Sequence, residues 1–168
     1  MPSKYLSPKL SLMLHLKDSW TETDPTGSDI RWTTSPIDEP VDYPMIQVTM
    51  RQRTPSLQVG PNARYRRLNI GTQPVYWVRP TLFVDLYVKE NDNLSNTGEG
   101  AVKNQRDNMV EEVVRILAYN PTGSTHIDNL DITDVVDADE LQPRPLVLHS
   151  RIAVRGYLFR TGSAMAGQ

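Results

Sequence analysis

Three residues of this chain have types and a spacing that could bind a metal ion. His126 and Asp128 stand two positions apart and His149 follows them, in the His-x-Asp…His order of non-haem iron sites. The interval between Asp128 and His149 is short for such a site, and His149 falls on the outward side of a predicted strand. We therefore expect these residues to bind no metal, and we expect no cofactor.

Acidic residues also recur at intervals of three. They are Asp128, Asp131, Asp134 and Asp137, with Asp139 and Glu140 directly after them. A calcium loop of the EF-hand type takes ligands at alternate positions and has a central glycine, and this segment has neither. No Lys or Arg interrupts residues 128–140. The pattern favours an acidic edge that is solvated or faces a partner.

The sequence shows no set of nucleophile, base and oxyanion donors. It has no cysteine, no glycine-rich phosphate loop and no serine in a nucleophile elbow. The paired carboxylates Asp38-Glu39 and Glu111-Glu112 fall in a predicted loop and on a predicted helix surface. We expect a protein that is not an enzyme.

Arginines gather in the middle of the chain, where six of them occur between Arg51 and Val84 without any acid. They are Arg51, Arg53, Arg64, Arg66, Arg67 and Arg79, and Trp77 lies among them. Arginines interleaved with aromatic residues suit nucleic acid, but the pI of about 5.9 and the acidic segments disfavour it. A protein interface is favoured because a guanidinium group binds carboxylates in a bidentate manner. A nucleic-acid-binding module remains the alternative.

The charge of the whole chain is separated into blocks, although its formal sum is only −2. Residues 18–42 contain seven acids and one arginine, and every charged residue after Glu140 is an arginine. Separated patches of opposite sign can hold copies of a protein, or stacked neighbours, in a fixed orientation.

Length and composition indicate one domain, residues 1–168. Thirteen prolines predict a loop-rich design. The first residues lack the pattern of a signal peptide, and no apolar run approaches the roughly 20 residues of a membrane span. We therefore expect no membrane partner. Residues 161–168 are small and polar and are predicted to form a C-terminal tail.

Two helices and four strands are expected to position these residues. The helices are predicted at residues 7–20, where alternating leucines leave a strand as the alternative, and 99–119. The strands are predicted at residues 43–51, 75–89, 127–136 and 146–159. Residues 21–43 read as an acidic connecting loop, and 52–74 as a projecting arginine-rich loop or hairpin. This order predicts an α+β fold: a mostly antiparallel β-sheet with helices packed on one face and long loop or hairpin insertions.

The strand at residues 75–89 has the clearest alternation. Leu82, Val84, Leu86 and Val88 are predicted to face the core, and Asp85 and the neighbouring aromatic residues to face outward. Several outward aromatics on one strand predict that this face is covered by the loop or by a subunit. In the second helix, Glu111 and Arg115 are predicted to form an i,i+4 pair.

The element order and pattern resemble a known family. Tyr43 to Met50 is a proline followed by alternating apolar residues, Arg79 to Val88 is a second strand, Asn104 to Leu117 is the helix that follows, and Val147 to Phe159 is a long closing strand. This arrangement, over about residues 7–160, is similar to the tail terminator (tail completion) proteins of long-tailed phages and related archaeal viruses. That family includes neck proteins of contractile-tailed phages.

The resemblance implies a structural virion protein that forms a ring, typically a hexamer, at the head-proximal end of a viral tail. Such a ring terminates the tail tube and joins it to the head connector, and the acidic residues 128–140 would line its channel or an interface between subunits. The implied partners are further copies of the chain, the tail tube protein, head–tail connector or neck proteins, and DNA that passes through without sequence-specific binding. The implied location is the virion, after assembly in the host cytoplasm. Another head–tail connector role is the alternative within the same class.

Overall fold

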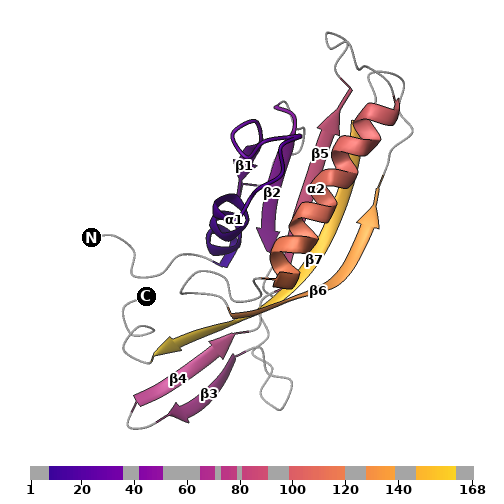
Figure 1. The fold of residues 1–168 in the computed structure, drawn as a ribbon. Coiled ribbons are helices and arrows are strands. Elements are labelled where there is room, and N and C mark those ends of the chain that lie inside the picture. Colours follow the sequence, from indigo (N-terminus) through magenta and orange to yellow (C-terminus); the bar gives the residue numbers. More distant parts are fainter. Residues whose placement is uncertain are drawn as a thin grey trace.

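The computed structural model describes residues 8–35, 42–50, 65–70, 73–78, 81–90, 99–119, 128–138 and 147–161. This part of the chain contains two helices, α1 (Pro8–Asp18) and α2 (Glu99–Tyr119) (Figure 1). Its strands are β1 (Arg31–Thr33), β2 (Met45–Met50), β3 (Tyr65–Ile70), β4 (Gln73–Val78), β5 (Thr81–Lys89), β6 (Asp128–Asp137) and β7 (Val147–Thr161).

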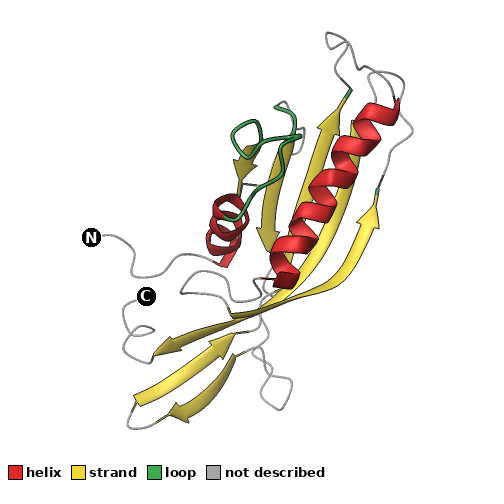
Figure 2. Ribbon diagram, in the orientation of Figure 1, coloured by secondary structure: helices red, strands yellow, loops and turns green. Residues whose placement is uncertain are grey.

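The strands form one sheet in the order β1-β2-β5-β7-β4-β3, with β6 paired to β7 as well. β1 is parallel to β2, and the other pairs are antiparallel. The two helices lie on the same face of the main sheet, which consists of β1, β2, β5, β7 and β6 (Figure 2). The predicted α+β fold, a mostly antiparallel sheet with helices on one face, is confirmed.

β4 and β5 lie end to end along one edge of β7. Val78 of β4 pairs with Leu158, and Thr81 of β5 pairs with Arg155. The residue number changes by three from one pair to the next on both sides, so the register along β7 does not shift between the two strands. The sequence predicted one strand over residues 75–89, and the structure has two strands that share one register.

β3 and β4 form an antiparallel hairpin, from the pair Tyr65–Val78 to the pair Ile70–Gln73. Together with the end of β7, this hairpin extends the sheet away from the part that the helices cover (Figure 1). The predicted range for a projecting loop or hairpin was 52–74. The described hairpin begins at residue 65 and ends at residue 78, and residues 52–64 lie outside the described residues.

The core lies between the helices and the main sheet. The strands contribute alternating residues that include Leu82, Val84, Leu86 and Val88 of β5, as predicted. α2 contributes one apolar stripe at helical spacing, formed by Val102, Met109, Val113, Ile116 and Leu117. α2 packs on β5, β7 and β6, and α1 packs on β1 and β2.

The segment at residues 7–20, which the sequence left between helix and strand, is a helix from Pro8 to Asp18. Proline suits the first helical position because its missing N–H would have no partner there. Leu12 and Leu16, one turn apart, are fully buried. Burial of both leucines on one face stabilises the helix, although the alternating leucines would also have suited a strand.

The acidic connection after α1 is partly ordered by tryptophans. Trp20 and Trp32 meet edge to face, with ring centroids 5.5 Å apart. Trp20 Nε1 donates to the Pro25 carbonyl at 3.1 Å, and Trp32 Nε1 donates to the Gly27 carbonyl at 2.9 Å. The connection was predicted to be loop throughout, but it contains β1, which adds to the sheet edge beside β2.

Candidate functional site

Strand β6 forms an acidic edge of the sheet. Asp128 begins the strand, and Asp131, Asp134 and Asp137 are exposed on it. Among the described strands β6 pairs only with β7, so its second edge is unpaired there. We call β6 the acidic edge. The two remaining acids predicted for this surface, Asp139 and Glu140, lie outside the described residues.

The acids of β6 do not all point to the same side of the sheet. Asp131 is paired in register with Arg155 and Asp134 with Ala153, on the face turned away from the helices, which we call the outer face. Neither aspartate has a hydrogen bond or ion pair to another described residue. On the outer face, the described part of the predicted acidic surface therefore includes the exposed Asp131 and Asp134.

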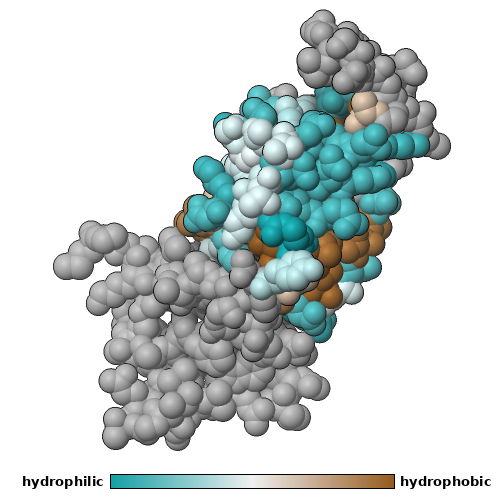
Figure 3. All heavy atoms as spheres, viewed as in Figure 1, coloured by the Kyte–Doolittle hydropathy of each residue, from teal (hydrophilic) through white to brown (hydrophobic). Residues whose placement is uncertain are grey.

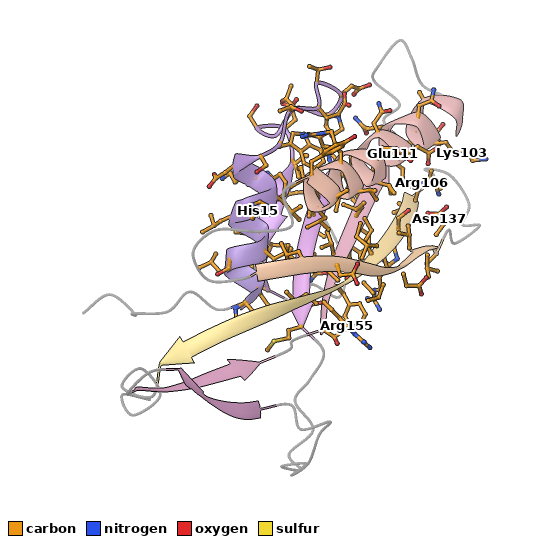
Figure 4. All side chains as sticks on the ribbon, turned by 60° about the horizontal axis from the view of Figure 1, so that its bottom comes forward. His15, Lys103, Arg106, Glu111, Asp137 and Arg155 are labelled. Atoms are coloured by element: carbon orange, nitrogen blue, oxygen red, sulfur yellow. The ribbon has the colours of Figure 1, made fainter. Side chains whose placement is uncertain are left out.

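Asp137 lies on the helix face and is held there. It accepts a hydrogen bond of 2.6 Å from the Ser150 hydroxyl, and its other carboxylate oxygen lies 3.9 Å from Arg106 Nη2. Figure 4 shows Arg106 on α2 and Asp137 on β6 pointing toward each other. Arg106 is buried within the apolar stripe of α2, so Asp137 helps to stabilise the packing of α2 on the edge strand.

The acidic edge also exposes apolar side chains. Val135 is 43% exposed and Val136 is 46% exposed. Figure 3 shows hydrophobic atoms at the surface beside the hydrophilic side of α2, in the region where Figure 1 places β6. Val135 pairs with Ile152 and Val136 with Arg151, so the two valines lie on opposite faces of the sheet at the same edge.

The described part of the predicted arginine-rich surface falls on the hairpin. Arg66 and Arg67 lie in β3, and Trp77 lies in β4. β3 ends the strand order, so its second edge is unpaired among the described strands. We call β3 the basic edge, because it carries two arginines and no acid. The other predicted arginines, Arg51, Arg53, Arg64 and Arg79, lie outside the described residues.

A polar cluster that the sequence did not predict lies on the outer face. The Asp85 side chain is 1% exposed and binds two cross-strand neighbours on β7. Arg151 donates to its two carboxylate oxygens at 2.7 and 3.2 Å, and His149 Nε2 hydrogen-bonds Oδ1 at 2.8 Å. Burial raises the pKa of the Asp85 carboxyl, but these hydrogen bonds outweigh burial and hold the pKa below its ordinary value.

Aromatic rings on the outer face are covered by cations or by an imidazole. The rings of Tyr87 and His149 are stacked, with centroids 4.4 Å apart and planes 2° apart. The guanidinium of Arg151 lies 5.0 Å from the centre of the Phe83 ring, which suits a cation–π contact. A loop or a subunit was predicted to cover this face; in the described part, the contacts with Tyr87 and Phe83 come instead from His149 and Arg151 of the neighbouring strand β7.

The outer face carries more cations than acids in its described part. Its exposed basic residues are Arg31, Lys89, Arg151 and Arg155, each placed there by strand alternation with buried neighbours. Figure 4 shows Arg155 on the side of the sheet away from the helices. Asp85 is paired with Arg151, and the exposed acids on this face, Asp131 and Asp134, lie on the acidic edge. Alternation predicts Arg151 and Arg155 on one face of their strand, but the whole surface could not be predicted because its cations come from three separate strands.

An ion pair within α2 also binds the loop after α1. Arg115 binds Glu112 with two hydrogen bonds of 2.7 Å, so the predicted pair of Arg115 with Glu111 is wrong. Glu112 Oε1 also accepts from the Thr21 backbone N–H at 2.6 Å and from its hydroxyl at 3.0 Å. Glu112 is preferred over Glu111 because Thr21 offers it two further donors.

Chemistry at a metal is not supported by the described residues. No cluster of three His, Asp or Glu residues suited to a metal ion occurs among them. His149 is engaged with Asp85 instead, and His126 lies outside the described residues. The arrangement that the structure does present is a set of charged surfaces, which can bind other macromolecules.

Comparison with known proteins adds no further constraint. No protein-family model matches the chain, and no curated protein sequence matches it significantly. Neither helix of the described part is long and apolar enough to cross a membrane. The surfaces of the fold are therefore the basis for assigning a function.

Proposed function

We propose that this chain is a structural virion protein that assembles into a ring of about six copies at the head-proximal end of a viral tail. The ring stops growth of the tail tube and joins the tube to the head connector. Its partners are other copies of itself, the tail tube protein and the head–tail connector or neck proteins. DNA passes through the ring without sequence-specific binding. The protein works in the virion after assembly in the host cytoplasm.

One observation supports this role above the others: the two edge strands β6 and β3 of a single sheet carry unlike charges. Asp131 and Asp134 are exposed on the acidic edge, whereas Arg66 and Arg67 belong to the basic edge on the extended hairpin. Unlike patches on one molecule favour head-to-tail contacts between copies. A head-to-tail contact closes into a ring when the rotation that relates neighbouring copies, repeated around the ring, adds up to one full turn. A protein that caps a tube needs only complementary surfaces and catalyses no reaction.

Mass in solution is the direct test. We expect light scattering behind size exclusion to give a species of about six times 19.1 kDa, and electron microscopy of that species to show rings with a central channel. Added to growing tubes of the tail protein from the same virus, the rings should arrest growth and appear at one tube end. A protein that stays monomeric and leaves tube length unchanged would contradict the proposal.

A nucleic-acid-binding module is a second candidate, and one observation favours it. The outer face presents four exposed basic residues, Arg31, Lys89, Arg151 and Arg155, near aromatic rings. Such a module would bind duplex DNA as a monomer, with an affinity that falls steeply as salt rises. Titration of labelled DNA with the protein at two salt concentrations separates this candidate from the ring, which should bind DNA weakly at both.

A further inference from the structure

We propose that copies of this chain associate by strand addition, with the basic edge β3 of one copy paired to the free edge of β6 in the next copy. The inference rests on the proposed function, because it names the contact by which the ring would close. It commits to a second copy of this chain as the occupant of the acidic edge.

The acidic edge and the basic edge lie on opposite sides of β7. β5 and β4 share one register along the same edge of β7. β6 and β5 both pair with Ile152, so β6 must lie along the opposite edge of β7. β3 lies beyond β4. The acidic and basic edges therefore face away from each other and cannot pair within one copy, whereas two neighbouring copies can join them head to tail.

The acidic edge has a regular stretch where a strand can be added. Register shifts interrupt its pairing with β7 between Asp128 and Asp131 and between Ile132 and Asp134. From Asp134 to Asp137 the pairing is regular. Within this stretch Val135 and Val136 are nearly half exposed on opposite faces of the sheet. A strand laid along this edge would pair with unpaired backbone groups and cover a valine on each face.

Charge decides which strand can be added. β6 carries four aspartates and no cation, so the β6 strands of two copies repel each other. This repulsion disfavours pairing between two β6 edges. β3 is six residues long, carries Arg66 and Arg67, and has no acid. β1 is the remaining free edge of the described sheet, but it has only three residues and one arginine. β3 is thus the edge with both the length and the charge to match.

Cross-linking tests the contact directly, because the chain has no cysteine and any introduced thiol is unique. One variant carries Val136→Cys on β6, and the other carries Asn69→Cys on β3. A short bis-maleimide tolerates a register that differs by a residue or two. We expect a covalent dimer when the two variants are mixed, and none from either variant alone. A dimer from V136C alone would mean a β6–β6 contact and would overturn the inference.

Charge reversal provides an independent test in the full chain. Asp131→Arg with Asp134→Arg should weaken association at least about tenfold, and so should Arg66→Glu with Arg67→Glu. All four changes in one chain should restore association to within about threefold of the original. Asp18→Arg with Glu111→Arg makes the same charge change as the aspartate reversal at exposed positions of the helix layer, and this control should have little effect. Circular dichroism melting checks that each variant folds.

The outcomes separate this contact from the proposed function. Rings of unchanged mass in both double reversals, without the mixed cross-link, would leave the ring intact and place its contact elsewhere. The mixed cross-link in open chains that never close would keep the contact and overturn the ring. Loss of association in the reversals without rescue in the combined variant would contradict the pairing of these two edges.

Discussion

Asp85 and Arg151 face each other across β5 and β7, and the guanidinium binds both oxygens of a carboxylate that is almost completely buried. The aspartate lies on the outer face of the sheet, away from the core between sheet and helices. Burial alone would raise its pKa, yet the hydrogen bonds from His149 and Arg151 lower it. The outer face is therefore built around a carboxylate that remains ionised.

Removing the arginine of this pair should destabilise the fold. Arg151→Ala leaves the buried Asp85 carboxylate with His149 alone, and an incompletely satisfied buried charge is costly. Because the Arg151 side chain is 48% exposed, water can replace part of what is lost. We expect the free energy of unfolding to fall by about 1–3 kcal/mol in urea titrations.

Arg155→Ala is the matched control for that measurement. Arg155 lies on the same strand and the same face, is exposed, and has no hydrogen bond or ion pair to another described residue. Its loss should change the free energy of unfolding by less than about 0.5 kcal/mol. Equal losses in the two variants would show that the Asp85 pair contributes no more than any surface arginine.

Acid should weaken the contact between α2 and the loop after α1. The hydrogen bonds from Arg115 lower the pKa of Glu112 from 4.5 to about 2, and those from Thr21 add to this effect against burial. A lowered pKa in the folded state means that the stabilisation is complete above about pH 4.5 and is lost as the pH falls toward about 2. The loss should reach about 2–3 kcal/mol.

Glu112→Gln tests the assignment of that acid-dependent loss. The variant should be less stable at neutral pH and should lose less stability than the original between pH 4.5 and pH 2. Glu111→Gln changes an exposed neighbour on the same helix and should leave the pH dependence as it was. If both variants keep the original slope, Glu112 does not carry the acid sensitivity.

The parts of the fold with strong local periodicity could be predicted from the sequence. α2 begins at Glu99 and ends at Tyr119 as predicted, because its apolar stripe and the proline after it are local signals. β5 and β7 were recognised by alternation. β1 was missed because three residues in a polar segment become a strand only when β2 lies beside them. Its existence depends on tertiary contacts.

The charged residues show the same limit. Alternation correctly placed Asp85 away from the core. It could not identify His149 and Arg151 as its partners, because they lie more than 60 positions later in the chain. The pair at Arg115 was assigned to Glu111 on helical spacing alone, whereas Thr21 determines that Glu112 is used. The acidic edge, by contrast, was visible as a run of aspartates. Which of these aspartates lie on which face of the sheet could be determined only from the register of β6 with β7.

The two tryptophans that order the loop before β1 should act together. Trp20 and Trp32 contact each other edge to face and each donates to a loop carbonyl. In a double-mutant cycle, Trp20→Leu and Trp32→Leu should couple by about 0.5–1.5 kcal/mol in the free energy of unfolding. Pairing Trp20→Leu with Ile152→Val, on the central strand β7, should give additive losses. Additivity in the tryptophan pair itself would show that the ring contact contributes nothing.

Salt should separate the two contributions to association at the acidic edge. Raising the ionic strength from about 0.01 to about 1 M shortens the screening length from about 30 to about 3 Å. Contacts between exposed Asp131 or Asp134 and arginines of a neighbouring copy should then weaken, and we expect the dissociation constant to rise at least about tenfold in sedimentation measurements. Val136→Ser removes apolar contact without changing charge, so it should weaken association by the same factor at both salt concentrations. A variant whose defect disappears at high salt would show that Val136 acts through the charged contacts, because burial of an apolar side chain is not screened by ions.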